Sequence, residues 1–372
     1  MKTLAKHTIK NNERDSNIEL LRIIATVFIV AHHFAIHGGF VFSNESISIN
    51  RLWIQFIQIG GKIGVNIFVL ISGYFLVTVK SVKTIKVVKL WMQIFFYSVA
   101  VFIVFVAIGI ENFGAKEFIK SLAPLTFSQW WFASAYFMLY LLSPYINILL
   151  KSFDQRQYIG YLVLLAFCWC VIPTITGRTF ESNSLLWFVF VYSFAGYLRL
   201  FKFETKLTGR MLITLSFLCI VVTFMSVVVF DVLGKKISFF AENATFFYSM
   251  QKLPILVIAI LMFVGFLKLN IGYIKFINIV ASASFGIYLL HDHDYVRNWL
   301  WNQAFKIASY EENNMLILYS LFVIAVVFIC CTVVEILRIF LLEKHYLSAV
   351  NKFVGFIEKV KNYTMNKIIK QL

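Results

Sequence analysis

The chain has 372 residues, of which 60% are hydrophobic and only 14% are charged, and this balance excludes an ordinary soluble globular protein. Its formal net charge of +16 is spread over short loops and both ends. Because no single basic, aromatic-studded face results, the charge does not indicate nucleic-acid binding.

Stretches of about 20 apolar residues, the length of a helix that crosses a bilayer, recur along the chain. They predict an all-α, polytopic transmembrane helical bundle of about ten helices. In chain order the predicted helices cover residues 18–40, 63–79, 87–110, 130–150, 158–173, 185–201, 211–230, 253–267, 276–290 and 315–341.

Basic residues concentrate in alternate loops, which indicates a topology with both termini in the cytoplasm. We therefore expect a basic cytoplasmic N-terminal segment (1–17), a transmembrane domain (18–341) and a basic amphipathic cytoplasmic tail (342–372) on the inner leaflet. The cations of the predicted inner loops are Lys80, Lys83, Lys86, Lys89, Lys151, Arg156, Arg199, Lys202, Lys206, Arg210, Lys268 and Lys275.

Three histidines interrupt the first predicted helix, in the stretch IIATVFIVAHHFAIHGGF at residues 23–40. Ionisable side chains at membrane depth are costly, so they indicate a functional site. Arg22 and His33 are eleven residues apart, which places them on one helix face and about 16 Å apart along the axis. Arg22 taken alone also fits a snorkelling cation paired with Glu19.

The neighbouring histidines differ in direction. His32 points about 100° away from His33, whereas His37 follows one turn later on the same face. His33 and His37 could bind zinc if the HDHD stretch at residues 291–294 supplied further ligands. Since the sequence shows no ligand spacing that brings these groups together, we expect no metal.

Four stretches, in order, carry a family resemblance: NIELLRIIATVFIVAHH, GVNIFVLISGYFL, WWFASAYFMLYLLSPYIN and SFGIYLLHDHDYVRNWLW. Together they resemble the membrane-bound acyltransferase 3 family, and most closely its bacterial capsule and exopolysaccharide O-acetyltransferases. The family's first helix carries an arginine, ten intervening residues and a histidine essential for transfer. The matching residues here are Arg22 and His33.

The resemblance implies a multi-pass enzyme of the bacterial cytoplasmic membrane. Such an enzyme moves an acyl group, typically acetyl, from cytoplasmic acyl-CoA to a hydroxyl of a cell-surface polysaccharide or its lipid-linked precursor. It implies no bound cofactor, because acetyl-CoA or another acyl-CoA is a substrate. The expected partners are this donor, the glycan acceptor and the lipid bilayer, and nucleic acid is not among them.

A neutral imidazole suits proton transfer at neutral pH. We expect His33 to take the proton of the acceptor hydroxyl or to carry the acyl group itself, and Arg22 to orient the donor or stabilise negative charge. Further candidate pocket residues are His32, Ser72, Tyr74, His291 and Arg297.

Two other functions fit polar residues inside a membrane protein. A transporter or flippase for a glycan or lipid-linked sugar would move its substrate without acyl transfer. A polysaccharide polymerase or ligase would favour a large outer loop with acids and arginines, and the stretch 231–252 is modest for that role.

Overall fold

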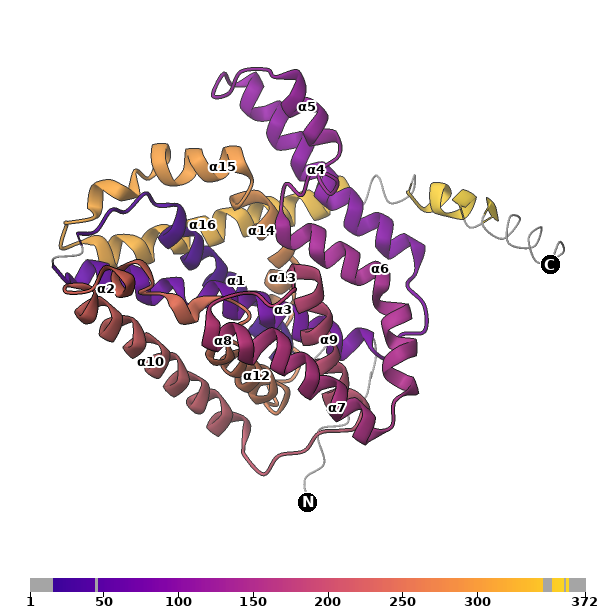
Figure 1. Ribbon diagram of the computed structural model, residues 1–372. Coiled ribbons are helices and arrows are strands. Elements are labelled where there is room, and N and C mark those ends of the chain that lie inside the picture. Colours follow the sequence, from indigo (N-terminus) through magenta and orange to yellow (C-terminus); the bar gives the residue numbers. More distant parts are fainter. Residues whose placement is uncertain (1–15, 44–45, 344–349, 358, 361–372) are drawn as a thin grey trace.

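The computed structural model describes residues 16–43, 46–343, 350–357 and 359–360, and this part of the chain contains helices and no strands (Figure 1). Within it, eight helical segments are long and apolar enough to cross a membrane: Ser16–His37, Ile49–Leu76, Thr84–Ala107, Trp131–Ser152, Gln155–Thr176, Gly209–Gly234, Ser238–Leu267 and Leu316–Glu343. Two shorter apolar helical segments, Ser184–Leu200 and Lys275–His291, complete the set.

The predicted helical membrane bundle is therefore confirmed, and each of the ten predicted stretches falls on a helical segment. The side of the membrane on which each terminus lies stays a prediction, as does the division into three parts. The predicted end segments, 1–17 and 342–372, lie largely outside the described residues.

Several of the apolar segments are built from more than one helix. The individual α-helices are α1 (Ser16–His37), α2 (Ile49–Gln58), α3 (Gly60–Leu76), α4 (Thr84–Ala107), α5 (Ala115–Leu122), α6 (Trp131–Ser152), α7 (Gln155–Ala166), α8 (Ile172–Thr176), α9 (Ser184–Leu200), α10 (Gly209–Gly234), α11 (Ser238–Glu242), α12 (Leu253–Leu267), α13 (Lys275–Ser282), α14 (Ser284–His291), α15 (Asp294–Asn298) and α16 (Leu316–Leu337).

The second apolar segment begins at Ile49, earlier than the predicted 63–79, because the polar helix α2 leads directly into α3. Arg51 of α2 is buried, and its guanidinium lies 2.7 Å from Asp231 Oδ1 of α10. A buried charge is tolerated when it is paired and hydrogen-bonded. Hydropathy alone missed α2 because this pairing partner lies 180 residues away in the chain.

Helices α1 and α3 pack closely against each other at the centre of the bundle, and α9 and α12 cover α3 (Figure 1). The glycines of α3 permit this approach. A Cβ atom at Gly61 would lie 2.2 Å from Cγ of His32, and one at Gly64 would lie 2.7 Å from the carbonyl oxygen of Ala25. Small residues at helix contacts in membranes have this role, so Gly61 keeps α3 beside the histidines of α1.

Helix α14 lies beside the end of α1 and against α16. Val30 and Phe34 of α1 share a buried apolar cluster with Ile287 of α14 and Val323 of α16. This packing brings residues about 250 positions apart in the chain to the same end of the bundle, next to the histidines.

On its other side, α14 meets a buried polar cluster on α16. Glu335 is fully buried, and it accepts hydrogen bonds from Tyr97 Oη (2.5 Å) and Arg338 Nε (2.7 Å). A Cβ atom at Gly286 would lie 2.2 Å from the carboxyl carbon of Glu335. The cluster therefore ties α4 and α16 together directly beneath α14.

Candidate active site

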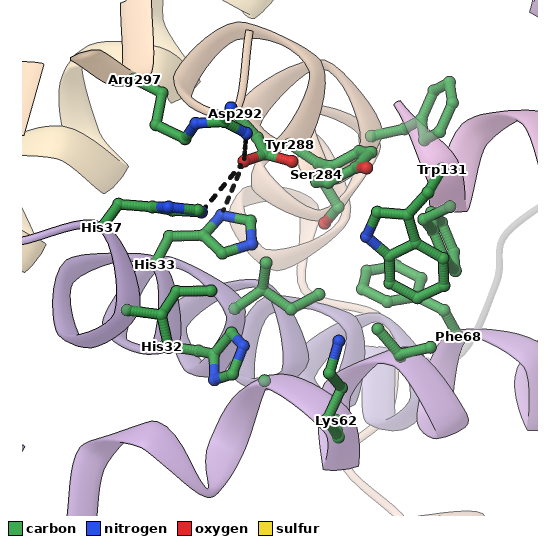
Figure 2. A pocket seen from close by; sticks show the side chains of 16 residues that line it. His32, His33, His37, Lys62, Phe68, Trp131, Ser284, Tyr288, Asp292 and Arg297 are labelled. Atoms are coloured by element: carbon green, nitrogen blue, oxygen red, sulfur yellow. Dashed lines mark hydrogen bonds and ion pairs between the residues drawn. The ribbon is translucent and has the colours of Figure 1, made fainter. Parts of the chain in front are cut away.

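A pocket of about 160 Å³ lies at the end of α1 that carries the three histidines (Figure 2). Its walls come from α1, α3, the start of α6, α14 and the residues that follow α14. Most of its lining surface is apolar, and the polar side chains gather on the histidine end of α1, on Lys62 and on the segment from Ser284 to Arg297.

His33 is buried in this pocket and contacts polar groups of two residues. Its Nδ1 atom lies 2.8 Å from Nε2 of His291 and 3.5 Å from Oδ1 of Asp292. Only 7% of His33 is exposed. The ring thus has one nitrogen held by partners on and just after α14, as Figure 2 shows for Asp292.

The hydrogen-bond network determines which nitrogen of His33 carries the proton. His291 Nδ1 lies 2.6 Å from the carbonyl oxygen of Ile287, which can only accept, so His291 Nδ1 is the donor. In neutral His291 the Nε2 atom is then an acceptor, and His33 Nδ1–H donates to it. The lone pair of His33 therefore lies on Nε2, available to a substrate.

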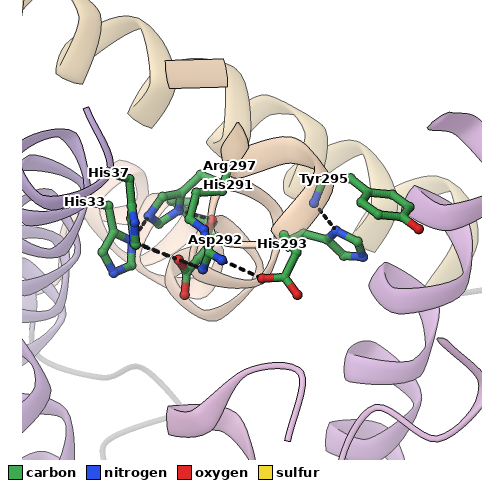
Figure 3. Close-up of polar contacts among 9 residues, drawn as sticks. His33, His37, His291, Asp292, His293, Tyr295 and Arg297 are labelled. Carbon is green, nitrogen blue, oxygen red and sulfur yellow. Dashed lines mark hydrogen bonds and ion pairs between the residues drawn. The ribbon is translucent and has the colours of Figure 1, made fainter. Parts of the chain in front are cut away.

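Asp292 lies close to several ionisable side chains of the pocket. Its Oδ1 atom lies 3.4 Å from Nη1 of Arg297 and 3.8 Å from Nε2 of His37 (Figure 3). Asp292 follows the last residue of α14 and is 5% exposed. Burial raises the pKa of its carboxyl to about 6, and the nearby Arg297 opposes that rise. At neutral pH the carboxylate form prevails.

His32 differs from His33 in its partner. Its Nδ1 atom lies 2.6 Å from the carbonyl oxygen of Gln58, at the junction of α2 and α3. His32 therefore lines the pocket while it also ties α1 to the neighbouring segment. His33, with a carboxylate and a second imidazole beside it, is the better placed base.

The pocket also contains polar residues that the sequence reasoning did not select. Lys62 of α3 lies 4.7 Å from the ring centroid of Trp131, and both line the pocket. Ser284 lines it as well, and within the described part of the chain its buried Oγ has no hydrogen-bond partner. A lone lysine inside an apolar helix was the signal for Lys62. Ser284 had no such signal.

Four of the predicted site residues do not line this pocket: Arg22, Ser72, Tyr74 and His291. Arg22 pairs with Glu19 at 3.1 Å, which is the ion pair that the sequence left open. Ser72 donates to a carbonyl of its own helix. Tyr74 accepts a hydrogen bond of 3.3 Å from Arg199, whose guanidinium lies over its ring. Of the predicted set, the pocket unites His32, His33 and Arg297, with His291 bonded directly behind His33.

His33, His37 and Asp292 each offer one ligand atom, and these atoms lie within 4.8 Å of one another. Two imidazoles and a carboxylate form a set that can bind zinc. Two of these groups also have protein partners, since His33 Nδ1 faces His291 and Asp292 faces Arg297. The expectation of no metal stays a prediction.

Comparison with known proteins gave one match. The family model described as an acyltransferase domain, that of the acyltransferase 3 family, matches residues 15–336. No curated protein and no solved structure matches the chain. The matched residues include every helix from α1 to α15, nearly all of α16, and the whole pocket. The chain therefore belongs to the acyltransferase 3 family of membrane acyltransferases.

Proposed function

We propose that this acyltransferase moves an acetyl group from cytoplasmic acetyl-CoA to a hydroxyl of a cell-surface polysaccharide or its lipid-linked precursor, in a bacterial cytoplasmic membrane. The observation that carries the proposal is the hydrogen-bond chain from Ile287 through His291 to His33. It leaves an imidazole lone pair in a buried pocket, which is what a general base for a hydroxyl needs.

In the proposed reaction, His33 Nε2 takes the proton of the acceptor hydroxyl as its oxygen attacks the thioester carbonyl. A C–O bond forms, and the carbonyl oxygen becomes negatively charged. Collapse of this intermediate breaks the C–S bond, and the departing CoA thiolate receives the proton from His33. The products are the acetyl ester and CoA with a free thiol. In an alternative order, His33 first carries the acetyl group.

Lys62 and Ser284 are proposed to stabilise the negative charge on the carbonyl oxygen. Both line the pocket that His33 lines, and the buried hydroxyl of Ser284 has no hydrogen-bond partner among the residues that the structure describes. Preorganised donors in a site poor in water stabilise such a charge far better than they do in bulk water. The Asp292 carboxylate stabilises the positive charge that His33 gains during the reaction.

Arg22 is proposed to act at the opposite end of α1 from His33. It lies about 16 Å from His33 along α1, too far to touch the reacting carbonyl together with His33. Its side chain is 25% exposed, and a guanidinium is well suited to phosphate groups. We therefore assign Arg22 to the anionic end of the donor, on the cytoplasmic side that the charge bias predicts.

The two other functions predict different outcomes. A transporter would need no acyl-CoA. A polymerase that used the stretch 231–252 would need its charged ends free, yet Asp231 is paired with Arg51 and Lys252 Nζ donates to the carbonyl of Pro173. Acyl transfer to a hydroxyl needs a proton acceptor at the reacting oxygen, and His33 is placed to be one.

The test is incubation of membranes that contain the protein with labelled acetyl-CoA, followed by analysis of the glycan for ester-linked label. We expect label with the wild type and none with His33→Ala, while His32→Ala retains activity. Equal amounts of each variant in the membrane serve as the control for insertion. Full labelling by His33→Ala would end the proposal.

A further inference from the structure

A second cavity, of about 410 Å³, lies on the other side of the short stretch that carries Asp292 and Arg297. It is bounded by the end of α4, by α5, by residues 127–129 and by residues 293–295. In Figure 3 the ring of Tyr295, which lines it, lies on the opposite side of this stretch from His33. Its volume falls in the range of roughly 300–1,000 Å³ that small-molecule sites occupy.

Buried side chains hold the floor of this cavity in place. The amide of Gln129 lies between Ser98 Oγ (2.5 Å) and His293 Nε2 (2.8 Å). His293, which is 3% exposed, accepts the backbone N–H of Tyr295 on Nδ1 (3.2 Å). The ring of His293 also lies edge-on to that of Trp130. The cavity is thus a formed site, in which Ser98, Gln129 and His293 hold one another in place by hydrogen bonds.

The remaining lining groups suit a sugar. Aromatic rings are present, with Phe102 and Tyr295 6.3 Å apart between centroids. Two exposed carboxylates, Glu117 and Asp294, also line the cavity, with Lys120 as its one lysine or arginine. Aromatic faces pack on the C–H faces of a sugar ring, while carboxylates accept hydrogen bonds from its hydroxyls.

Arg297 connects the second cavity with the first. Its Nη2 atom lies 2.6 Å from Oδ1 of Asp294, which lines the second cavity. Its Nη1 atom lies 3.4 Å from Oδ1 of Asp292, which contacts His33. One guanidinium therefore bridges a carboxylate of each cavity.

We infer that the second cavity binds a non-reacting sugar unit of the glycan acceptor, next to the unit whose hydroxyl reaches His33. This inference rests on the proposed function, because it assumes a glycan acceptor. The cavity supplies binding energy remote from the reacting atoms, which positions the acceptor hydroxyl at the base. The enzyme then recognises at least two neighbouring units of the chain.

The test uses cells that produce the full-length protein and whose own membranes supply the natural acceptor. Their membranes are incubated with labelled acetyl-CoA, and two products are measured: ester-linked label in the glycan and free CoA thiol. The readout is the rate of glycan labelling at saturating acetyl-CoA, expressed as a ratio to the amount of folded protein in the membrane. Loss of acceptor binding lowers this ratio, and the released thiol falls with it, because each transferred acetyl group frees one CoA thiol.

We expect Tyr295→Ala and Glu117→Gln to lower the ratio about tenfold, the loss typical of removing an important binding contact. Glu117 is exposed on α5, so its substitution does not endanger folding. Glu312→Gln, a matched change of an exposed acid that lines neither cavity, should leave the ratio unchanged.

Ratios within about twofold of the wild type for both cavity variants would overturn the inference. In that outcome the wild type still labels the glycan, so the proposed function stands. If the wild type itself transfers no label, the proposed function fails, and the inference fails with it. The two failures are therefore distinguished by the wild-type reaction alone.

Discussion

The Nδ1 atom of His33 lies 2.8 Å from the Nε2 atom of His291. Because neutral His291 donates its single ring proton, on Nδ1, to the carbonyl of Ile287, its Nε2 must accept, and this contact fixes the tautomer of His33. His291 thus holds the position that a carboxylate holds in a serine hydrolase triad. Its contribution is to orient the base.

Replacing His291 tests this role. His291→Leu removes the acceptor of the His33 proton, so we expect kcat to fall about 100-fold or more. His291→Gln keeps an acceptor oxygen and should retain more activity than His291→Leu. Activity is measured as labelled acetyl in the glycan, per amount of folded protein. Equal activities of the two variants would show that His291 only fills space.

Lys62 offers a test of charge stabilisation. Lys62→Met keeps the length of the side chain and removes its charge, so we expect kcat at saturating acetyl-CoA to fall about 100-fold. Lys62→Arg should recover part of the loss. The control is Lys116→Met, which removes a lysine from exposed α5 that lines neither cavity. An unchanged kcat for Lys62→Met would exclude Lys62 from the reaction.

Arg22 should act on donor binding more than on the chemical step. Because it lies about 16 Å from His33 along α1, we expect Arg22→Lys to raise KM for acetyl-CoA about tenfold, with a smaller change in kcat. The matched change Arg156→Lys, on exposed α7, should alter neither constant. A fall in kcat alone would place Arg22 at the reacting centre instead.

We expect the activity to depend on pH through the carboxyl group of Asp292. Its pKa is raised to about 6 by burial, so the carboxylate that faces His33 and Arg297 is present above that pH and becomes protonated below it. We expect activity to fall as the pH is lowered through about 6. Asp292→Asn removes this titration but not that of the histidines. The difference between the two pH profiles therefore isolates the carboxyl, and identical profiles would rule it out.

The contact between α1 and α3 can be tested with a pair of glycines. A Cβ atom at Gly61 would lie 2.2 Å from His32 Cγ, whereas one at Gly160 of α7 would have nothing within 4 Å. We expect Gly61→Ala to destabilise the protein by about 1–3 kcal/mol. Gly160→Ala should be neutral or stabilising by up to about 1 kcal/mol. Thermal unfolding in detergent measures both, and similar Tm values would contradict the packing argument.

The helices could be predicted from the sequence because a membrane leaves few alternatives to an apolar helix. The polar helix α2 could not, because its buried Arg51 is stabilised by Asp231, and hydropathy does not register a pair formed across the bundle. The division of 276–290 into α13 and α14 was equally invisible, since both halves are apolar.

The sequence identified candidate site residues where an ionisable side chain, uncommon in an apolar segment, stood out. His33 and Arg297 both line the pocket, and each stands out as a charged or ionisable group near an apolar segment. Helical periodicity predicts Arg22 on the face of His33, but a shared face says nothing of contact across about 16 Å. Ser284 is a common residue in an apolar helix, so only the assembled pocket distinguishes it.

The final acceptor in the histidine chain is a main-chain oxygen, that of Ile287. Any amino acid at position 287 presents the same oxygen, so mutation of that residue leaves the proton arrangement of His33 unchanged as long as α14 keeps its path. Conversely, a shift of α14 would alter the base without touching a histidine. The basicity of His33 therefore depends on the position of α14. Designs that aim to change this basicity should alter the residues that pack α14 against its neighbours.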